Sequence, residues 1–330
     1  MTQHKMHPNR REFLRDAARA VVSAGGVSIA AGALSQQVES AERKPPMSRI
    51  PIVDTHQHLW DLSKFRLPWT SNVAALNKSF LMSDYLKATK GLNIAKTVYM
   101  EVDLHPSQQD AEAEFVIATC KKDDNPMAAG VISGRPNSEG FAGYITKYKD
   151  SRYIKGVRQV LHVPSAKAGF CLQKQFIASV RLLGELGMSY DICIRPEELT
   201  DAAKLVSHCP DTRLILDHCG NRRPGGPHGD RWRRDLAVVA RYKNVVCKVS
   251  GIVDKAGDRW KPEDLAPVVN HTLETFGPDR VMFGGDWPVC TLKASFRDWA
   301  SALHEIVADR SLEDRRKLFH DNAVRFYGLG

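Results

Sequence analysis

Eight short apolar segments, separated by segments with helical periodicity, are the feature that most constrains how this chain can fold. From residue 50 onward the apolar runs are continuous, which is typical of parallel strands that are covered on both faces. The predicted strands are Ile50–Thr55, Ala95–Val102, Ala128–Ser133, Ile154–Val160, Ser189–Ile194, Arg213–Asp217, Asn244–Val249 and Arg280–Gly285. The helical segments between them include Asp110–Cys120, Gln173–Leu186, Asp201–Ser207, Asp235–Tyr242 and Leu265–Phe276.

This alternation predicts an α/β protein of the (β/α)₈-barrel type. The competing architecture is a doubly wound open sheet, which would place a glycine-rich phosphate loop after the first strand. Neither G-x-G-x-x-G nor G-x-x-x-x-G-K follows Thr55. A barrel of roughly 250 residues leaves room for a leader in a chain of 330 residues. We therefore predict one barrel domain over residues 49–330.

The first forty residues differ from the rest and are typical of an export signal. Arg10 and Arg11 precede Phe13, the pattern of a twin-arginine signal. The apolar stretch Ala20–Leu34 is too short and too mild for a stable membrane span. An ordinary basic tail is the alternative. We predict a signal peptide over residues 1–40, a linker over residues 41–48, and export to the periplasm or attachment to the membrane by an uncleaved leader.

The positive net charge and the spacing of the cysteines bear on which classes of protein the chain can belong to. The formal net charge of +9 favours anionic ligands, but the chain carries no recognisable nucleic-acid-binding motif, and we expect no nucleic-acid partner. The seven cysteines include no C-x-x-C pair, so neither a zinc ribbon nor a disulfide framework is indicated. Cys193 and Cys247 lie in predicted strands, where a cysteine is usually a small buried hydrophobe.

Ionisable side chains recur at the predicted carboxyl ends of the strands, where barrels carry their chemistry. The first strand runs into His56 and His58, which lie two residues apart and therefore point to the same side. Such a pair is typical of a metal site. His218 follows the sixth strand and Asp286 the eighth. An acid opposite two histidines can hold and deprotonate a water, although a single histidine such as His218 is more often structural.

Other residues at these ends admit both a functional and a structural interpretation. Glu101 and Lys248 could serve the site or form a buried pair that orders the barrel interior. Trp60 and Trp287 lie beside the histidine and aspartate motifs, where they could form an apolar wall for a ring or simply pack in the core. The arginine-rich run Asn221–Arg234 is typical of a long loop, either a lid or a solvated basic segment.

Four motifs resemble the amidohydrolase superfamily, in particular the amidohydrolase-2 group that contains sugar-lactone and muconolactone-type lactonases. They are Asp54-Thr55-His56-Gln57-His58-Leu59-Trp60, Gly156-Val157-Arg158, Leu216-Asp217-His218-Cys219-Gly220 and Phe283-Gly284-Gly285-Asp286-Trp287-Pro288. The resemblance runs from about Ile50 to Tyr327. It implies a distorted barrel whose mouth carries His56, His58, His218 and Asp286, with Asp286 as general base. The fifth strand departs from many metal-dependent members because Asp191–Pro196 contains no histidine, which disfavours a two-metal centre.

These observations together predict a hydrolase that opens a lactone of a sugar acid or related carboxylate, an anionic or polyhydroxylated small molecule. Asp286 would take a proton from water, and the histidines would stabilise the oxyanion. We expect one divalent ion, Zn²⁺, although a metal-independent mechanism stays open. The predicted metal ligands are His56, His58, His218, Asp286 and, as a ligand or its support, Glu101. Arg158, with Lys155 or Lys248, would bind a carboxylate or ring oxygens.

Two alternatives stay open at this point. A metal-dependent, non-oxidative decarboxylase of the same superfamily would use the same ligands on an unsaturated or aromatic carboxylate. An exported barrel that binds a ligand without catalysis belongs to another class, and the presence of Asp286 disfavours it.

Overall fold

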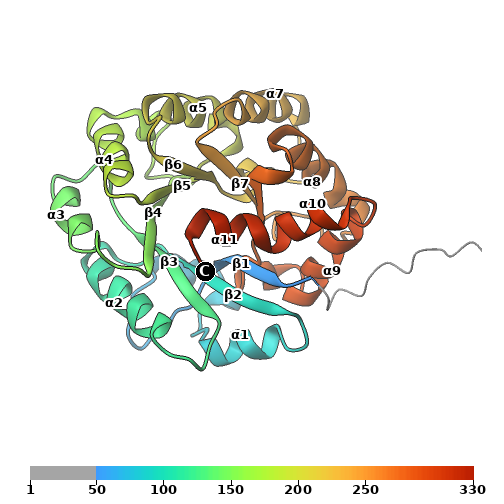
Figure 1. The fold of residues 1–330 in the computed structure, drawn as a ribbon, viewed down its shortest axis with the longest axis horizontal. Helices are drawn as coiled ribbons and strands as arrows, with labels where there is room; N and C mark the ends of the chain where they lie inside the picture. Colours follow the sequence, from blue (N-terminus) through green and yellow to red (C-terminus); the bar gives the residue numbers. More distant parts are fainter. Residues whose placement is uncertain (1–49) are drawn as a thin grey trace, which may run out of the picture. The chain divides into compact units, whose positions relative to one another are not determined.

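Eight parallel strands form a barrel at the centre of the protein, as predicted (Figure 1). The structure is a computed structural model, and it describes residues 50–330. The strands pair in sequence order: β1 (Ile52–Gln57), β2 (Ile94–Met100), β3 (Met127–Ser133), β4 (Ile154–Val160), β5 (Ser189–Cys193), β6 (Arg213–Leu216), β7 (Val245–Val249) and β8 (Val281–Phe283). The Thr55 hydroxyl donates to the Phe283 carbonyl at 2.6 Å, which ties β1 to β8 and helps to close the barrel.

Helices follow the strands and surround the barrel, and the last one, α11, lies across one end of it (Figure 1). They are α1 (Met82–Ala88), α2 (Gln109–Cys120), α3 (Phe141–Thr146), α4 (Lys174–Glu185), α5 (Leu199–His208), α6 (His218–Asn221), α7 (Gly229–Ala240), α8 (Pro262–Phe276), α9 (Phe296–Ile306), α10 (Leu312–Arg316) and α11 (Asn322–Tyr327). Their buried faces pack on the outer side chains of the strands, and this packing forms the main core. The interior of the barrel holds a second, smaller apolar cluster.

All eight predicted strands are present, and the last is the one that differs most in length. β8 ends at Phe283 instead of Gly285. A Cβ atom on Gly284 would lie 2.7 Å from the Cβ of His56, so the chain approaches β1 too closely there for a larger residue. The amide of Gly285 donates to the Asp54 carboxylate at 2.7 Å instead of continuing the strand ladder.

The long loop predicted over Asn221–Arg234 is wrong in its extent. α7 begins at Gly229, six residues before the predicted start, and only residues 222–228 separate it from α6. Trp232 explains the longer helix, because its side chain is buried and its indole N–H donates to the Cys219 carbonyl at 2.9 Å. This contact holds the first turns of α7 against the segment that follows β6.

The C-terminal segment covers the amino ends of the strands. Ala323, Tyr327 and Leu329 pack with the apolar residues of the barrel interior. The Lys96 ammonium near the start of β2 donates to the Leu329 carbonyl, and the Asn322 amide donates to the Val281 carbonyl at the start of β8. With one end of the barrel covered in this way, ligand access is left to the carboxyl ends of the strands.

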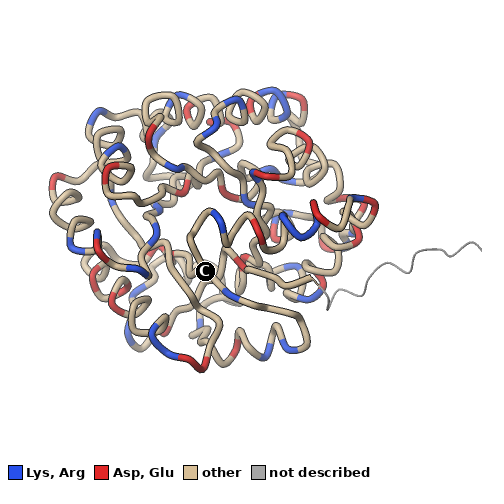
Figure 2. Tube along the Cα trace, viewed as in Figure 1, with Lys and Arg blue, Asp and Glu red and all other residues tan. Residues whose placement is uncertain are grey.

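Charged residues of both signs are interleaved along the outer helices and loops (Figure 2). The seven cysteines are all free, and Cys193 and Cys247 are buried as predicted. Within residues 50–330, no helix has the length and apolar character needed to cross a membrane. The predicted signal peptide and linker lie outside the described residues, so the export signal stays a prediction.

Candidate active site

A cavity of about 240 Å³ opens at the carboxyl ends of the strands. Part of its wall is apolar and comes from Trp60, Trp69, Val102, Val160, Val163 and Val289. The polar part comes from three histidines, one amide and five charged groups: His58, His162, His218, Asn221, Asp103, Arg158, Asp254, Lys255 and Asp286. A mixed wall of this kind suits a small polar ligand with one apolar face.

Strained backbone is concentrated at this cavity. Six non-glycine residues of the described chain have a positive φ, and four of them line the cavity: Asp103, His218, Asn221 and Asp286. A left-handed conformation costs a residue with a Cβ about 1–2 kcal/mol. Such strain persists where the surrounding structure holds it, and it is common at functional sites.

His58 presents an unprotonated nitrogen to the centre of the site. Its Nδ1 lies 2.9 Å from the carbonyl of Met100. Because a carbonyl only accepts hydrogen bonds, Nδ1 carries the proton and Nε2 keeps its lone pair. Burial, together with the nearby Arg158 charge, lowers the pKa of His58 to about 4, so the ring is neutral at physiological pH.

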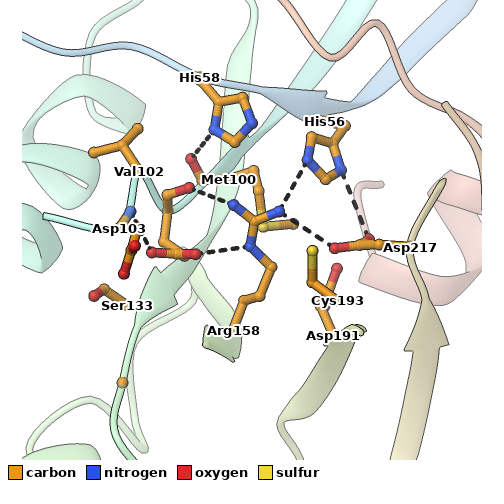
Figure 3. Close-up of polar contacts among 12 residues, drawn as sticks. His56, His58, Met100, Val102, Asp103, Ser133, Arg158, Asp191, Cys193 and Asp217 are labelled. Atoms are coloured by element: carbon orange, nitrogen blue, oxygen red, sulfur yellow. Dashed lines mark hydrogen bonds and ion pairs between the residues drawn. The ribbon is translucent and has the colours of Figure 1, made fainter. Parts of the chain in front are cut away.

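His56 also directs a lone pair at the site, and Arg158 sets its orientation (Figure 3). The guanidinium NH1 of Arg158 lies 3.2 Å from His56 Nε2 and donates to it. The His56 Nδ1–H then faces Asp217, whose Oδ1 is 3.7 Å away. Burial and the surrounding positive groups lower the pKa of His56 well below its usual value.

Asp286 faces both imidazoles. Its Oδ1 lies 3.4 Å from Nε2 of His58 and 3.6 Å from Nε2 of His56, too long for strong hydrogen bonds. Burial raises the pKa of Asp286 to about 7, although Lys255 and Arg158 oppose this effect. Three atoms with lone pairs therefore converge on one point, which favours a positive centre between them.

The position of Asp286 depends on a second, structural carboxylate. Asp54 accepts hydrogen bonds from the amides of His56 at 3.0 Å and Gly285 at 2.7 Å, and from the Tyr85 hydroxyl at 2.9 Å. It therefore joins the end of β1 to the segment that carries Asp286. The first residue of the D-T-H-Q-H motif holds the two halves of the site together without facing the cavity.

His218 enters the site from a left-handed turn. Residues 218–221 all have a positive φ, including Cys219 and Gly220. The turn places His218 and Asn221 in the cavity wall, while Cys219 is buried in the core. The His218 Nδ1 lies 2.9 Å from the Ser250 hydroxyl. At Gly251, a Cβ would lie 2.1 Å from that same nitrogen, so the residue after Ser250 must be a glycine.

The donor set fits a zinc-like ion. Two groups of three residues bring their ligand atoms within 4.8 Å of one another: His56, His58 and Asp286, and His56, Asp217 and His218. A tetrahedral centre with bonds of about 2.1 Å separates neighbouring ligand atoms by about 3.4 Å, close to the distances from Asp286 to the two imidazoles. The His58 hydrogen bond to a carbonyl is also typical of a metal-binding imidazole. Arg158 competes, because an ion on His56 Nε2 displaces its hydrogen bond.

Glu101 lies outside both groups of candidate ligands. Its Oε1 accepts from Nε of Arg158 at 2.8 Å and its Oε2 from the amide of Asp103 at 2.6 Å. Both oxygens are occupied, so the carboxylate supports Arg158 instead of facing the site. Of the two roles predicted for it, the supporting one agrees with this geometry.

Arg158 lines the cavity, but its hydrogen bonds are committed to the protein. Besides His56 and the Glu101 carboxylate, it donates to the Glu101 carbonyl at 2.8 Å and to Asp217 at 3.3 Å. A substrate carboxylate would have to break these bonds. The structure therefore places Arg158 at the site as a support for His56, not as the free anion binder that the sequence suggested.

Lys155 and Lys248 are not brought to the cavity. Lys155 is the second residue of β4 and lies near Arg152 and Arg213, at the amino ends of the strands. Lys248 is fully buried inside the barrel, where its ammonium contacts Asp191 at 2.6 Å and Asp217 at 3.6 Å. The alternative interpretation of Lys248, a buried charge that orders the interior, agrees with this position, although its partners are aspartates and not Glu101.

Of the two tryptophans predicted to form an apolar wall, only Trp60 lines the cavity. Trp287 packs edge-to-face on Phe80 and Tyr85, with ring centroids 5.5 Å apart in both cases. The backbone turns at Asp286, which has a left-handed φ, and the Trp287 side chain after it packs in the core outside the barrel.

Sequence reasoning missed the residues that later loops contribute. Lys255 and Asp254 come from the segment between β7 and α8, where the ammonium donates to the Gly251 carbonyl at 2.6 Å and pairs with Asp254 at 3.2 Å. Asn221 comes from the left-handed turn. His162 lies just beyond β4. Only its position two residues after a strand end could have indicated it.

Comparison with known proteins shows the family to which the chain belongs. The sequence profile described as Amidohydrolase matches residues 53–329. L-Fucono-1,5-lactonase from Burkholderia multivorans is 28% identical over 84% of this chain and 96% of that protein. The 4-sulfomuconolactone hydrolase of Rhizobium radiobacter is 22% identical over 84% of this chain and 89% of that protein.

A solved structure of an amidohydrolase from Burkholderia multivorans with bound zinc has the same fold. It superposes with a TM-score of 0.74 and 26% identity, covering 85% of this chain and all of that one.

The close approach of Gly251 to His218 gives a direct test of the site geometry. In Gly251→Ala, the new methyl group must displace the imidazole, and the positive φ adds about 1–2 kcal/mol of strain. We expect a Zn²⁺ affinity at least about tenfold lower, as is common when a ligand is misplaced, measured by competition with a chromogenic chelator.

Gly257→Ala, in the same loop, is the matched control, because a Cβ there meets nothing within 4 Å. Unchanged Zn²⁺ affinity in Gly251→Ala would contradict the placement of His218 at the metal-binding centre.

Proposed function

The chain belongs to the amidohydrolase family, and we propose that it hydrolyses the lactone of a neutral, polyhydroxylated sugar acid. The observation that carries the proposal is the position of Asp286, which lies on the cavity wall within 3.6 Å of two neutral imidazoles. In the absence of an ion, burial raises the pKa of this carboxylate to about 7, which suits it to accept a proton from water at physiological pH. Likeness to L-fucono-1,5-lactonase over most of the chain supports the same reaction class.

The reaction needs one base and a site for the developing negative charge. Asp286 accepts a proton from water while the water oxygen forms a bond to the lactone carbonyl carbon. The ring carbon–oxygen bond then breaks, and the ring oxygen takes the proton back from Asp286, which leaves the open hydroxy acid. A divalent ion, when bound, polarises the carbonyl and lowers the pKa of water. His56, His58 and Asp286 would hold it, and His218, which shares the second candidate group with His56, is a further candidate ligand.

The charges of the cavity favour a neutral substrate over an anionic one. Its two cations are Arg158 and Lys255, and both are already paired within the protein. Its anions are Asp103, Asp254 and Asp286. They outnumber the side-chain cations along the wall, and the charge of a divalent ion, if bound, would be taken up by its ligands and the lactone carbonyl. A sulfonate or second carboxylate would enter without a free cation, at a large cost in desolvation. Hydroxyl groups, in contrast, can use the exposed carboxylate oxygens and amides as partners.

The size of the cavity limits the substrate further. At about 240 Å³ it lies below the roughly 300–1,000 Å³ of sites for drug-sized ligands. A single five- or six-membered lactone ring with its hydroxyl groups fits this description better than a disaccharide. Trp60 and Trp69 provide the apolar face on which such a ring could lie.

A lactone panel tests the proposed substrate class. With a pH indicator, we expect acid release from L-fucono-1,5-lactone and related sugar lactones, and a kcat/KM at least about tenfold lower for 4-sulfomuconolactone and 2-pyrone-4,6-dicarboxylate. A tenfold difference corresponds to about 1.4 kcal/mol of transition-state stabilisation. Preference for the anionic lactones would contradict the charge argument. Release of carbon dioxide from aromatic acids, without lactone opening, would instead indicate the decarboxylase.

The metal ion expected at His56, His58 and Asp286 can be tested independently of the substrate. We expect about one Zn²⁺ per chain in protein purified without chelator, because imidazole and carboxylate ligands suit zinc. Chelation should abolish lactone hydrolysis and added Zn²⁺ should restore it, with elemental analysis as the measurement. His58→Ala should lose the ion, whereas His208→Ala, on the exposed end of α5, should keep it. Full activity in metal-free protein would instead favour carbonyl activation by the histidines and Arg158.

A further inference from the structure

A hydrogen-bonded chain of three side chains lies beside the cavity and takes no part in the chemistry of Asp286. Cys193 is the last residue of β5, and its side chain is fully buried. Its sulfur lies 3.3 Å from Nδ1 of His162 and accepts from the Asn221 amide at 3.8 Å. His162 and Asn221 both line the cavity. The buried thiol therefore links the side chains of His162 and Asn221 on the side away from the cavity.

The backbone holds this chain in place on both sides. Cys193 pairs with Val160 across the β4–β5 ladder. The amide of Leu161 donates to the Cys193 carbonyl at 2.8 Å, which fixes the chain one residue before His162. Asn221 is fixed by its left-handed turn and by a bond from Nδ2 to the Ile194 carbonyl at 2.8 Å. The contacts thus join three strand ends and do not depend on one flexible side chain.

The distribution of protons follows from the chemistry of the groups. The Asn221 Nδ2 faces the Ile194 carbonyl, which only accepts, so the amide nitrogen and not its oxygen points at Cys193. The sulfur accepts this bond, which leaves its own S–H free to donate to the His162 ring at 3.3 Å. When the thiol donates to Nδ1, the proton of the neutral His162 ring lies on Nε2.

Both partners stay uncharged in this arrangement. Burial raises the pKa of the Cys193 thiol to about 12, although Arg158 opposes this effect. Partial desolvation lowers the pKa of His162, and the positive charges of Lys255, Arg158 and Arg195 act in the same direction, although the residue keeps contact with solvent. A thiolate–imidazolium pair is thus disfavoured, and the ring is neutral.

We infer that His162 donates a hydrogen bond from Nε2–H to the ring oxygen or a hydroxyl oxygen of the bound lactone, and that Cys193 is the positioning residue that selects this tautomer. The inference rests on the proposed function. His162 is exposed to solvent and forms part of the cavity wall, and among the described residues its Nε2 has no hydrogen-bond partner, so this nitrogen is accessible to a ligand. A neutral imidazole that donates in this way stabilises charge on an oxygen without transferring its proton.

His162 adds a hydrogen-bond donor to a cavity wall whose other charged groups either accept hydrogen bonds or are already paired. The aspartates at the cavity accept hydrogen bonds, and the N–H and ammonium groups of Arg158 and Lys255 are paired within the protein. An ester or hydroxyl oxygen of the substrate needs a donor, and His162 supplies one on the wall formed after β4. This position lies beside Lys255, so charge that develops on the oxygen is further stabilised.

Kinetics on L-fucono-1,5-lactone test the donor role. His162→Ala should lower kcat/KM about tenfold, the usual scale for one neutral hydrogen bond. His162→Gln should stay within about threefold of the wild type, because its amide group donates from the position of Nε2. The exposed His208→Ala is the control. Wild-type kcat/KM in His162→Ala would overturn the inference.

The role of Cys193 has a readout that does not depend on turnover. In protein labelled with ¹⁵N-histidine, the ring nitrogens of His162 should report a proton on Nε2 alone. Cys193→Ala should give a mixture of tautomers and a partial loss of kcat/KM, and Cys193→Ser should restore both because its hydroxyl also donates. Cys120→Ala, on α2, is the control for a cysteine away from the cavity.

The two proposals fail in different ways. A proton on Nδ1, or on both nitrogens, in an enzyme that opens lactones would overturn the inference and leave the proposed function intact. If the wild-type enzyme opens no lactone, the proposed function fails, and the substrate-directed role of His162 fails with it.

Discussion

The ionic network around Arg158 is the interaction on which the rest of the site depends. Inside the barrel, Arg158 binds Glu101 and Asp217, and Lys248 binds Asp191 and Asp217. These groups come from five different strands or strand ends, and all are buried. A buried ion pair contributes little net stability because desolvation offsets its attraction, but removal of one partner is costly. We therefore interpret the network as a device that fixes orientation. The network orients the His56 ring, which lies between Arg158 and Asp217 (Figure 3).

The C-terminal segment covers the amino ends of the strands, on the side of the network opposite the cavity. It packs Tyr327 and Leu329 against the apolar residues at the amino ends of the strands, below the network. Of the six described non-glycine residues with a positive φ, four lie at the cavity: Asp103, His218, Asn221 and Asp286. In a low-dielectric interior, the neutral imidazoles and the raised pKa of Asp286 share one cause, burial, which disfavours every charged form that lacks a partner. A bound cation would supply that partner and lower the pKa of Asp286.

The strands and the pair of histidines after β1 could be predicted from the sequence because both follow simple periods. Continuous apolar runs mark buried parallel strands, and residues two apart share a face, which brought His56 and His58 together. Lys155 was misplaced although the predicted strand has the same bounds as β4. As its second residue, Lys155 lies at the amino end of the strand, far from the mouth of the barrel. Lys255 and Asn221 could not be found, because irregular loops and a left-handed turn have no sequence period. Arg158 was placed at the site correctly, but only the structure shows that its donors are occupied.

The most direct test of the account is the turnover of L-fucono-1,5-lactone by Asp286→Asn. This substitution keeps the shape of the side chain and removes the base. General-base catalysis typically contributes about 10²- to 10⁴-fold, and we predict a loss of kcat in that range with an unchanged melting temperature. Asp258→Asn, at a highly exposed carboxylate, should match the wild type. A rate within a few-fold of the wild type in Asp286→Asn would contradict the assignment of Asp286 as the base, and with it the mechanism proposed for this site.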